Sequence, residues 1–193
     1  MTDPVLHLLV GPNGAGKTSL YEHVLGPTTH LEFVNADIIA AARWPDDAAA
    51  MSYEAAVLAT ERRSELIETR TSFVTETVFS HGSKLKLVQS ARDAGYLVSL
   101  HVVLVPEALA VARVTNRVEV GGHHVPEEKI RARYSRLWPL VTSAIVLVDN
   151  ATVYDNSRAA KPFRVVARFE RGVLVGQPDW PTWTPDALMA AGR

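Results

Sequence analysis

Two kinds of hydrophobic pattern alternate along this chain. Short runs such as residues 5–10 and 97–105 are nearly all apolar, which is typical of strands covered on both faces. Longer segments between them, such as residues 83–94, carry apolar residues at helical spacing. Strands that alternate with helices in this way predict βαβ units, and therefore an α/β fold in which helices flank a parallel sheet.

The pattern also sets the expected element boundaries. We expect parallel strands at residues 5–10, 32–35, 72–76, 97–105 and 152–155. We expect helices that begin near residues 19, 37, 106 and 125, and further helices at residues 51–70 and 83–94. The segment 144–148 fits either a strand or the end of the preceding helix. Residues 163–169 and 173–175 flank Glu-Arg-Gly and predict a C-terminal β-hairpin.

Residues 11–18 read Gly-Pro-Asn-Gly-Ala-Gly-Lys-Thr and match the G-x-x-x-x-G-K-[ST] phosphate-loop pattern. A glycine-rich turn can match by accident, but here a strand precedes the loop and a helix follows it, as the motif requires. Its backbone N–H groups would cradle phosphate, Lys17 would reach the terminal phosphates, and the Thr18 hydroxyl would ligate Mg²⁺. The sequence therefore predicts an ATP and Mg²⁺ site formed by Gly11, Pro12, Asn13, Gly14, Ala15, Gly16, Lys17, Thr18 and Ser19.

Polar residues recur where the other expected strands end. In an open parallel sheet, ligands bind outside the carboxyl ends of the strands, so these residues are candidates for the site. They are Asn35 and Asp37 after the second strand, Thr75, Glu76 and Thr77 at the third, and Asp155, Asn156 and Ser157 at the fifth.

Asp37 is the candidate general base that aligns an acceptor hydroxyl, and the alternative is an ordinary helix N-cap. Glu76 would support the metal, as in Walker-B-type sites, or bind a substrate hydroxyl; alternatively, it simply faces water. Thr75 and Thr77 alternate to the opposite face from Glu76, so at least one of them has a structural role if Glu76 faces the site.

Two arginine-bearing helices joined by Gly121-Gly122-His123-His124 predict a lid over residues 113–136. In it, Arg117 and Arg133 would stabilise charge on the transferred phosphate. A solvated basic face is the alternative for each arginine. The paired histidines lack a carboxylate or thiolate set at ligand spacing, so we expect His123 to contact phosphate or substrate rather than a metal.

The composition limits which classes of protein remain possible. The 193 residues predict one domain, with a core at about 5–158, the lid, and a hairpin and tail at 163–193. Twenty Lys and Arg against 21 Asp and Glu disfavour a protein that coats nucleic acid. The chain has no cysteine, no signal-peptide pattern and no apolar run near the ~20 residues of a membrane span, which predicts a cytoplasmic protein.

The ordered set of these motifs resembles the zeta-toxin family of P-loop kinases, and more narrowly its compact bacterial branch. The resemblance covers residues 5–158 and rests on residues 11–18, Asn35-Ala36-Asp37, Thr75-Glu76-Thr77, Arg117 with Gly121-Gly122-His123, Arg133-Tyr134 and Asp155-Asn156-Ser157. It implies a nucleotide-kinase-like P-loop fold and an ATP-dependent kinase that phosphorylates the amino sugar of UDP-N-acetylglucosamine. It also implies a small helical antitoxin as partner.

Carried over to this sequence, the resemblance makes Asp37 the base and Arg117 and Arg133 the lid arginines. It places Glu76 and Thr77 in the substrate cleft, and Asn156 and Ser157 near the adenine. Two other functions stay open: a kinase for another metabolite or an antibiotic, and a nucleotide-dependent switch that acts on a protein partner. The lid favours a kinase, because a kinase must exclude water to avoid hydrolysing ATP.

Overall fold

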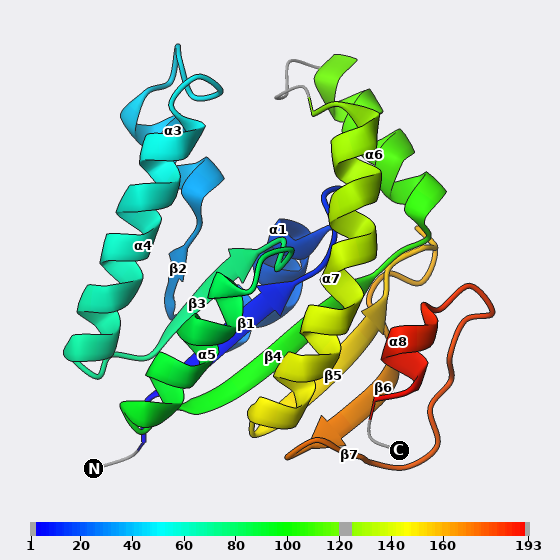
Figure 1. Cartoon of the computed structure of the whole chain (residues 1–193). Helices are drawn as coiled ribbons and strands as arrows, with labels where there is room; N and C mark the ends of the chain where they lie inside the picture. The colour runs from blue at the N-terminus through cyan, green and yellow to red at the C-terminus, as the bar shows by residue number, and fades with distance from the viewer. Residues whose placement is uncertain (1–2, 120–124, 192–193) are drawn as a thin grey trace.

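A seven-stranded sheet organises the part of the chain that the structure describes. The computed structural model describes residues 3–119 and 125–191, with only the backbone described for residues 117–119 (Figure 1). The strand order is β2-β3-β1-β4-β5-β6-β7. The first five strands along the chain run parallel, and β6 and β7 each pair antiparallel with their neighbour. The strands are β1 Val5–Val10, β2 Glu32–Val34, β3 Phe73–Thr77, β4 Leu97–Leu104, β5 Asn150–Asp155, β6 Arg164–Glu170 and β7 Val173–Leu174.

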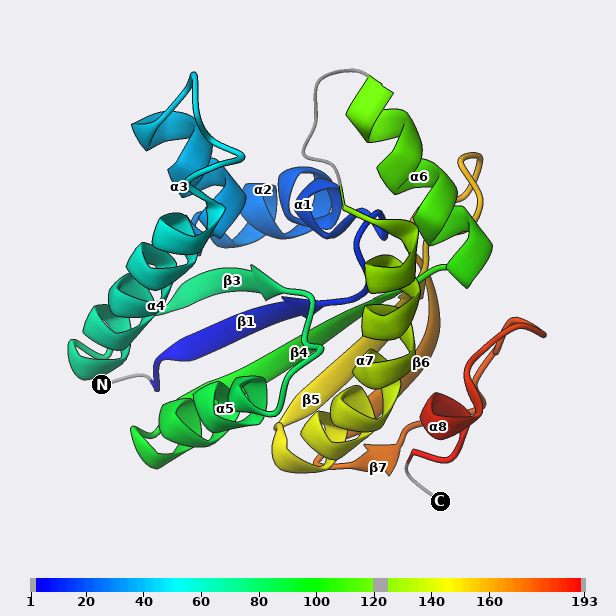
Figure 2. The same cartoon turned by 45° about the horizontal axis from the view of Figure 1, so that its top comes forward.

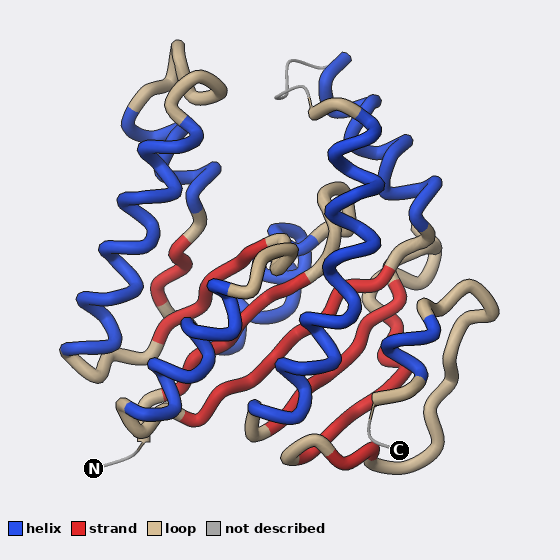
Figure 3. Tube along the Cα trace, viewed as in Figure 1, coloured by secondary structure: helices blue, strands red, loops and turns tan. Residues whose placement is uncertain are grey.

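Helices cover both faces of this sheet. Figures 1 and 2 show α5 and α7 on one face and α1 on the other, and Figure 3 shows the strands as a continuous layer between them. The helices are α1 Lys17–Leu20, the π-helix η1 Tyr21–Leu25, α2 Gly26–Thr29, α3 Ala36–Arg43, α4 Ser52–Glu68, α5 Ser83–Asp93, α6 Glu107–Glu119, α7 Glu127–Leu147 and α8 Asp186–Met189. None of the described helices is long and apolar enough to cross a membrane.

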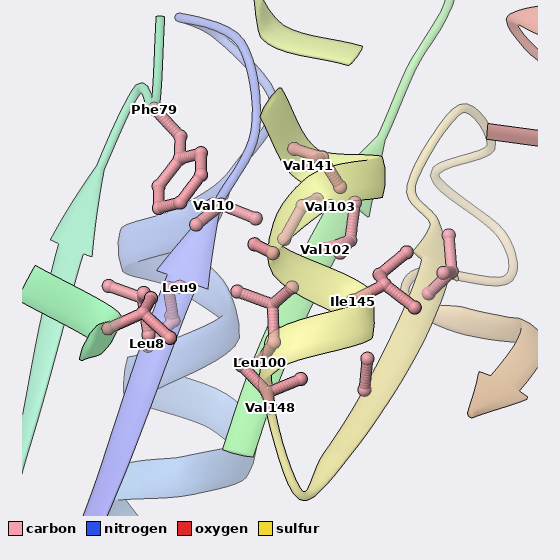
Figure 4. Packing of buried hydrophobic residues seen from close by; sticks show 14 of the residues in the cluster. Leu8, Leu9, Val10, Phe79, Leu100, Val102, Val103, Val141, Ile145 and Val148 are labelled. Atoms are coloured by element: carbon pink, nitrogen blue, oxygen red, sulfur yellow. The ribbon is translucent and has the colours of Figure 1, made fainter. Parts of the chain in front are cut away.

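The core lies between the central strands and α7. Leu8 and Val10 of β1 and Val102 of β4 are fully buried, and Val10 and Val102 lie close to Val141 of α7 (Figure 4). Full burial of one such side chain contributes about 1.5–3 kcal/mol. Leu9 and Val103, which alternate to the other face, are fully buried as well, and burial on both faces explains why β1 and β4 read as continuous apolar runs.

Most expected elements are present. The ambiguous segment 144–148 is the end of α7, which continues to Leu147. The hairpin forms as β6 and β7. The first helix is irregular, because the π-helix η1 follows α1, and this irregularity was not predicted. In the C-terminal tail, Trp180 and Trp183 are partly buried against the core.

Two helical arms stand beyond the carboxyl ends of the strands. Figure 1 shows α3 with the start of α4 on one side, and α6 with the start of α7 on the other. The first arm connects β2 to β3, and the second connects β4 to β5. The phosphate loop lies at the base of both arms, because it follows β1, which lies between β3 and β4.

Candidate active site

The phosphate loop has the backbone that its glycines predict. Gly14 and Gly16 adopt left-handed conformations, with φ of 76° and 92°. A Cβ atom at Gly16 would come within 2.5 Å of Asn156 Nδ2, so the loop and the chain after β5 leave no room for a side chain there. The backbone of Ala15 donates to the Pro12 carbonyl at 3.2 Å, which closes the turn. The loop therefore enters α1 in the form that a P-loop requires.

Lys17 is the first residue of α1 and is buried, with 7% of its surface exposed. Its Nζ donates a hydrogen bond to the Pro12 carbonyl at 3.2 Å. This bond folds the side chain back over the loop, so the ammonium group lies over the backbone that would cradle phosphate. A phosphate contact by Lys17 is the role that the motif predicts for this position.

Thr18 and Glu76 meet beside the loop. Their contact follows from the sheet, because β3 pairs parallel with β1 and places Glu76 opposite Leu9, two residues before Gly11. The Thr18 hydroxyl donates to Glu76 Oε2 at 2.8 Å. A hydroxyl and a carboxylate side by side are hard oxygen donors of the kind that Mg²⁺ prefers, so the residues present fit that ion.

No group of three or more His, Cys, Asp or Glu able to hold a metal ion occurs among the described residues. Mg²⁺ is commonly held by one or two protein oxygens, by waters and by phosphates of the nucleotide. Glu76, which we expected near the metal or in the substrate cleft, contacts Thr18, the residue predicted to bind Mg²⁺. Thr18 is the predicted ligand, and Glu76 is its partner.

A cavity of about 680 Å³ opens beside the loop, and Glu76 is not among its lining residues. Asn156 forms part of its wall and donates from Nδ2 to the Ala15 carbonyl at 2.8 Å. Arg113 joins the phosphate loop to the chain after β5, because its guanidinium donates to the Gly14 carbonyl at 3.3 Å and to the Asn156 carbonyl at 3.0 Å. The lining residues are Gly14, Gly16, Ser19, His23, Val24, Arg113, Asn156, Pro162 and Phe163. The size and the mainly apolar lining suit a nucleoside.

The loop after β5 is held by Asp155. The backbone of Ser157 donates to Asp155 Oδ1 at 2.8 Å, and Arg164 lies 3.1 Å from Asp155 Oδ2. Burial acts to raise the pKa of Asp155, but the hydrogen bonds from Ser157 and Arg164 outweigh it and lower the pKa. Ser157, predicted to contact the nucleotide, is not among the residues that line the cavity.

Asp37 lies in the first turn of α3, and its side chain is exposed. The alternative role as N-cap falls to Asn35, whose Oδ1 accepts from the backbone of Asp37 at 2.7 Å and of Ile38 at 3.3 Å. Asn35, a predicted substrate contact, is therefore occupied with capping. The cap leaves the Asp37 carboxylate at the carboxyl edge of the sheet, available for a ligand.

Thr75 and Thr77 make internal hydrogen bonds. Thr75 is fully buried and donates to the Val34 carbonyl at 2.7 Å, which ties β3 to β2. The hydroxyl of Thr77 accepts from the backbone of Phe79 at 3.3 Å. Both threonines therefore support the strand that carries Glu76.

The predicted lid coincides with the arm of α6 and α7. Arg133 is half-buried on α7. The side chain of Arg117, and Gly121, Gly122 and His123, lie outside the described residues. Arg131, on the same helix as Arg133, pairs with Glu107 at 3.3 Å and with Glu127 at 2.7 Å, so it joins α6 to α7.

The family model described as an AAA domain (AAA_33) matches residues 6–140, and the chain belongs to this family. The match covers the phosphate loop, Asp37, Glu76 and most of both arms. A sequence search against curated proteins finds no significant match.

Several solved structures share this fold. A chain of the AvrRxo1-ORF1:AvrRxo1-ORF2 complex crystallised with ATP is 17% identical, with a TM-score of 0.71 over 90% of this chain. This chain spans 60% of that one. The PezAT toxin–antitoxin system of Streptococcus pneumoniae gives 14% identity and a TM-score of 0.62, covering 80% of this chain and 69% of that one. A candidate kinase from Chloroflexus aurantiacus J-10-fl is 15% identical, with a TM-score of 0.66. The alignment covers 83% of this chain and 92% of that one.

At these identities the likeness establishes the fold. The chain has a kinase-like P-loop fold with a mostly parallel seven-stranded sheet flanked by helices, as its sequence predicts.

Proposed function

We propose that this protein is a zeta-toxin-like, ATP-dependent kinase that transfers the γ-phosphate to a hydroxyl group of a small molecule. The observation that carries the proposal is the hydrogen bond from Thr18 to Glu76, 2.8 Å long, beside Lys17. It brings together the hydroxyl, carboxylate and ammonium groups that phosphoryl transfer uses. The nearby cavity supplies a place for the nucleoside.

In the proposed reaction, the acceptor oxygen bonds to the γ-phosphorus while the bond from that phosphorus to the bridging oxygen of ADP breaks. Asp37 orients the acceptor hydroxyl and takes its proton. Lys17, Arg117 and Arg133 stabilise the charge on the transferred group. Mg²⁺, when bound next to Thr18 and Glu76, supplies charge neutralisation at the phosphates.

The acceptor we propose first is a UDP-activated amino sugar such as UDP-N-acetylglucosamine. This proposal rests on the resemblance to zeta toxins and on the similarity in fold to the PezAT toxin–antitoxin structure. The resemblance also leads us to propose a small helical antitoxin as partner and a location in the cytoplasm, and the toxin–antitoxin nature of the PezAT system supports the partner. A different metabolite is the alternative acceptor, because the chain spans 60% of the AvrRxo1 chain that it resembles.

The test is to incubate the purified protein with Mg²⁺-ATP and each of a panel of UDP-sugars and unactivated sugars, and to follow products by mass spectrometry. Asp37→Asn keeps the size of the side chain but cannot take the proton, whereas Asp46→Asn changes an exposed carboxylate outside the proposed site. We expect one added phosphate on a UDP-amino sugar with the wild type and Asp46→Asn. We expect none with Asp37→Asn. Equal product from all three proteins would remove Asp37 from the reaction.

A further inference from the structure

Arg63 is a buried cation on the inner face of α4. The buried side chains of this helix are Ala55, Ala59, Arg63 and Leu66, so an arginine occupies a stripe that is otherwise apolar. Arg63 is 9% exposed. Buried charges are normally paired, because leaving water costs an ion several kcal/mol.

The partners of Arg63 are hydroxyl groups. Its Nη2 donates to Thr60 Oγ1 at 2.7 Å, and its Nη1 lies 3.5 Å from Thr75 Oγ1. Among the residues that the structure describes, no carboxylate forms an ion pair with Arg63. By contrast, its neighbour Arg62 pairs with Glu32 at 2.7 Å and with Glu65 at 2.8 Å on the exposed side of the helix. Within the described residues, carboxylates therefore pair with the exposed Arg62 and not with the buried Arg63.

Lys84 is a second cation beside Arg63. It lies in the first turn of α5 and is half-buried. Burial lowers the pKa of Lys84, and the positive charge of Arg63 lowers it further. Burial also lowers the pKa of Arg63. Two like charges in a desolvated place repel each other, and a bound anion would relieve both the repulsion and the desolvation.

This pair lies on the acceptor side of the phosphate loop. Thr75, which Arg63 approaches, bonds to Val34 of β2, and α3 with Asp37 begins two residues after Val34. Helical side chains lean toward the helix N-terminus, and the bond to Thr60 gives Arg63 this direction. Figure 1 shows that α4 runs opposite to β3. A side chain that leans toward the N-terminus of α4 therefore extends toward the carboxyl edge of the sheet. The nucleoside cavity lies beyond β1, at the loop after β5.

We propose that Arg63 and Lys84 form a subsite that binds an anionic oxygen group, a carboxylate or a phosphate, on the acceptor. The proposal rests on the proposed kinase function and narrows its substrate class to negatively charged acceptors. An arginine fork and a lysine ammonium both bind such groups through charge-assisted hydrogen bonds.

The test compares Arg63→Gln and Lys84→Met with Lys86→Met, which removes an exposed cation two residues away on the same helix. The acceptors are matched pairs: UDP-N-acetylglucosamine with N-acetylglucosamine for phosphate, and gluconate with glucose for carboxylate. We expect turnover with the charged member of one pair. Turnover of UDP-N-acetylglucosamine would indicate a phosphate subsite, and turnover of gluconate would indicate a carboxylate subsite. We expect Lys84→Met and Arg63→Gln to raise the KM for that acceptor about tenfold or more, with the KM for ATP unchanged. Lys86→Met should match the wild type.

A binding measurement separates this subsite from the kinase function. The protein is saturated with a non-hydrolysable ATP analogue, which fills the phosphate loop, and titrated calorimetrically with inorganic phosphate and with gluconate. If an anion binds to the wild type and to Lys86→Met but not to Lys84→Met, the subsite is supported. This holds even if no acceptor is phosphorylated, and in that case only the kinase proposal fails. The subsite is overturned if neither anion binds and no charged acceptor is preferred, or if Lys84→Met and folded Arg63→Gln behave like the wild type. Thermal unfolding of each variant checks its folding.

Discussion

Thr18 donates its hydroxyl hydrogen to Glu76 at 2.8 Å, and this bond joins the phosphate loop to the end of β3. The two residues lie 58 positions apart, and the parallel pairing of β1 with β3 brings them together. The proposed function depends on this contact, because it places a carboxylate at the position where a P-loop protein holds Mg²⁺.

Replacing Glu76 with Gln is expected to weaken Mg²⁺ binding while leaving the fold intact. The amide still accepts a hydrogen bond from Thr18 but has lost its negative charge. The Mg²⁺ concentration for half-maximal activity should rise about tenfold or more, as is common when a partner of a metal ligand is changed. Glu61→Gln, on the exposed side of α4, is the control. An unchanged Mg²⁺ requirement in Glu76→Gln would place Glu76 outside the metal site.

Lys17→Ala should weaken ATP binding and transfer together. The ammonium group lies over the loop, where it would contact the terminal phosphates. Loss of a charged hydrogen bond of about 1.5–3 kcal/mol corresponds to a roughly 10- to 100-fold weaker Kd for ATP. Calorimetry with a non-hydrolysable ATP analogue measures the binding, and Lys129→Ala, an exposed lysine on α7, serves as the control. Wild-type affinity in Lys17→Ala would contradict the placement of ATP.

Gly16→Ala should both destabilise the protein and block nucleotide binding. Gly16 has a φ of 92°, and a Cβ there would lie 2.5 Å from Asn156 Nδ2. Strain of this kind costs about 1–3 kcal/mol, which urea unfolding can resolve. Gly82→Ala is a matched control, because no atom lies within 4 Å of a Cβ built there. Equal unfolding free energies for the two variants would show that the loop tolerates a side chain.

Stability should fall as the pH drops below 6.5. His7 and His101 lie 3.0 Å apart between ring nitrogens, and His101 also approaches the Tyr154 hydroxyl at 3.2 Å. Burial and then the charge of His7 lower the pKa of His101 to about 3, and burial lowers the pKa of His7. Both rings are neutral in the fold, so below the unfolded pKa of 6.5 the unfolded state binds more protons.

Between pH 7 and pH 5, His101 is expected to lower the free energy of unfolding by about 2 kcal/mol, and His7 lowers it further. Urea unfolding at both pH values measures it, and His101→Gln should reduce the difference. A free energy of unfolding that does not change between these pH values would contradict neutral, buried rings.

The sequence predicted the phosphate loop and the polar strand ends, because these features depend on local motifs and on the common direction of parallel strands. It named Asp37 as the alternative cap of α3, whereas Asn35 caps that helix, since both residue types suit the position and only the backbone geometry decides between them. Arg113 was noted as one of several helix arginines, but its contact with Asn156 depends on packing across 43 residues. No local sequence pattern indicates that Arg63 is buried. Its burial follows from the way α4 faces β3.

The fate of the γ-phosphate tests the central claim most directly. The protein is incubated with γ-labelled ATP and the acceptor panel, and label in phosphorylated acceptor and in inorganic phosphate is counted for the wild type and Asp37→Asn. We predict that the wild type transfers most of the label to an acceptor and that Asp37→Asn, still able to bind ATP, does not. Label found only as inorganic phosphate, at equal rates in both proteins, would contradict a kinase and indicate a nucleotide-dependent switch.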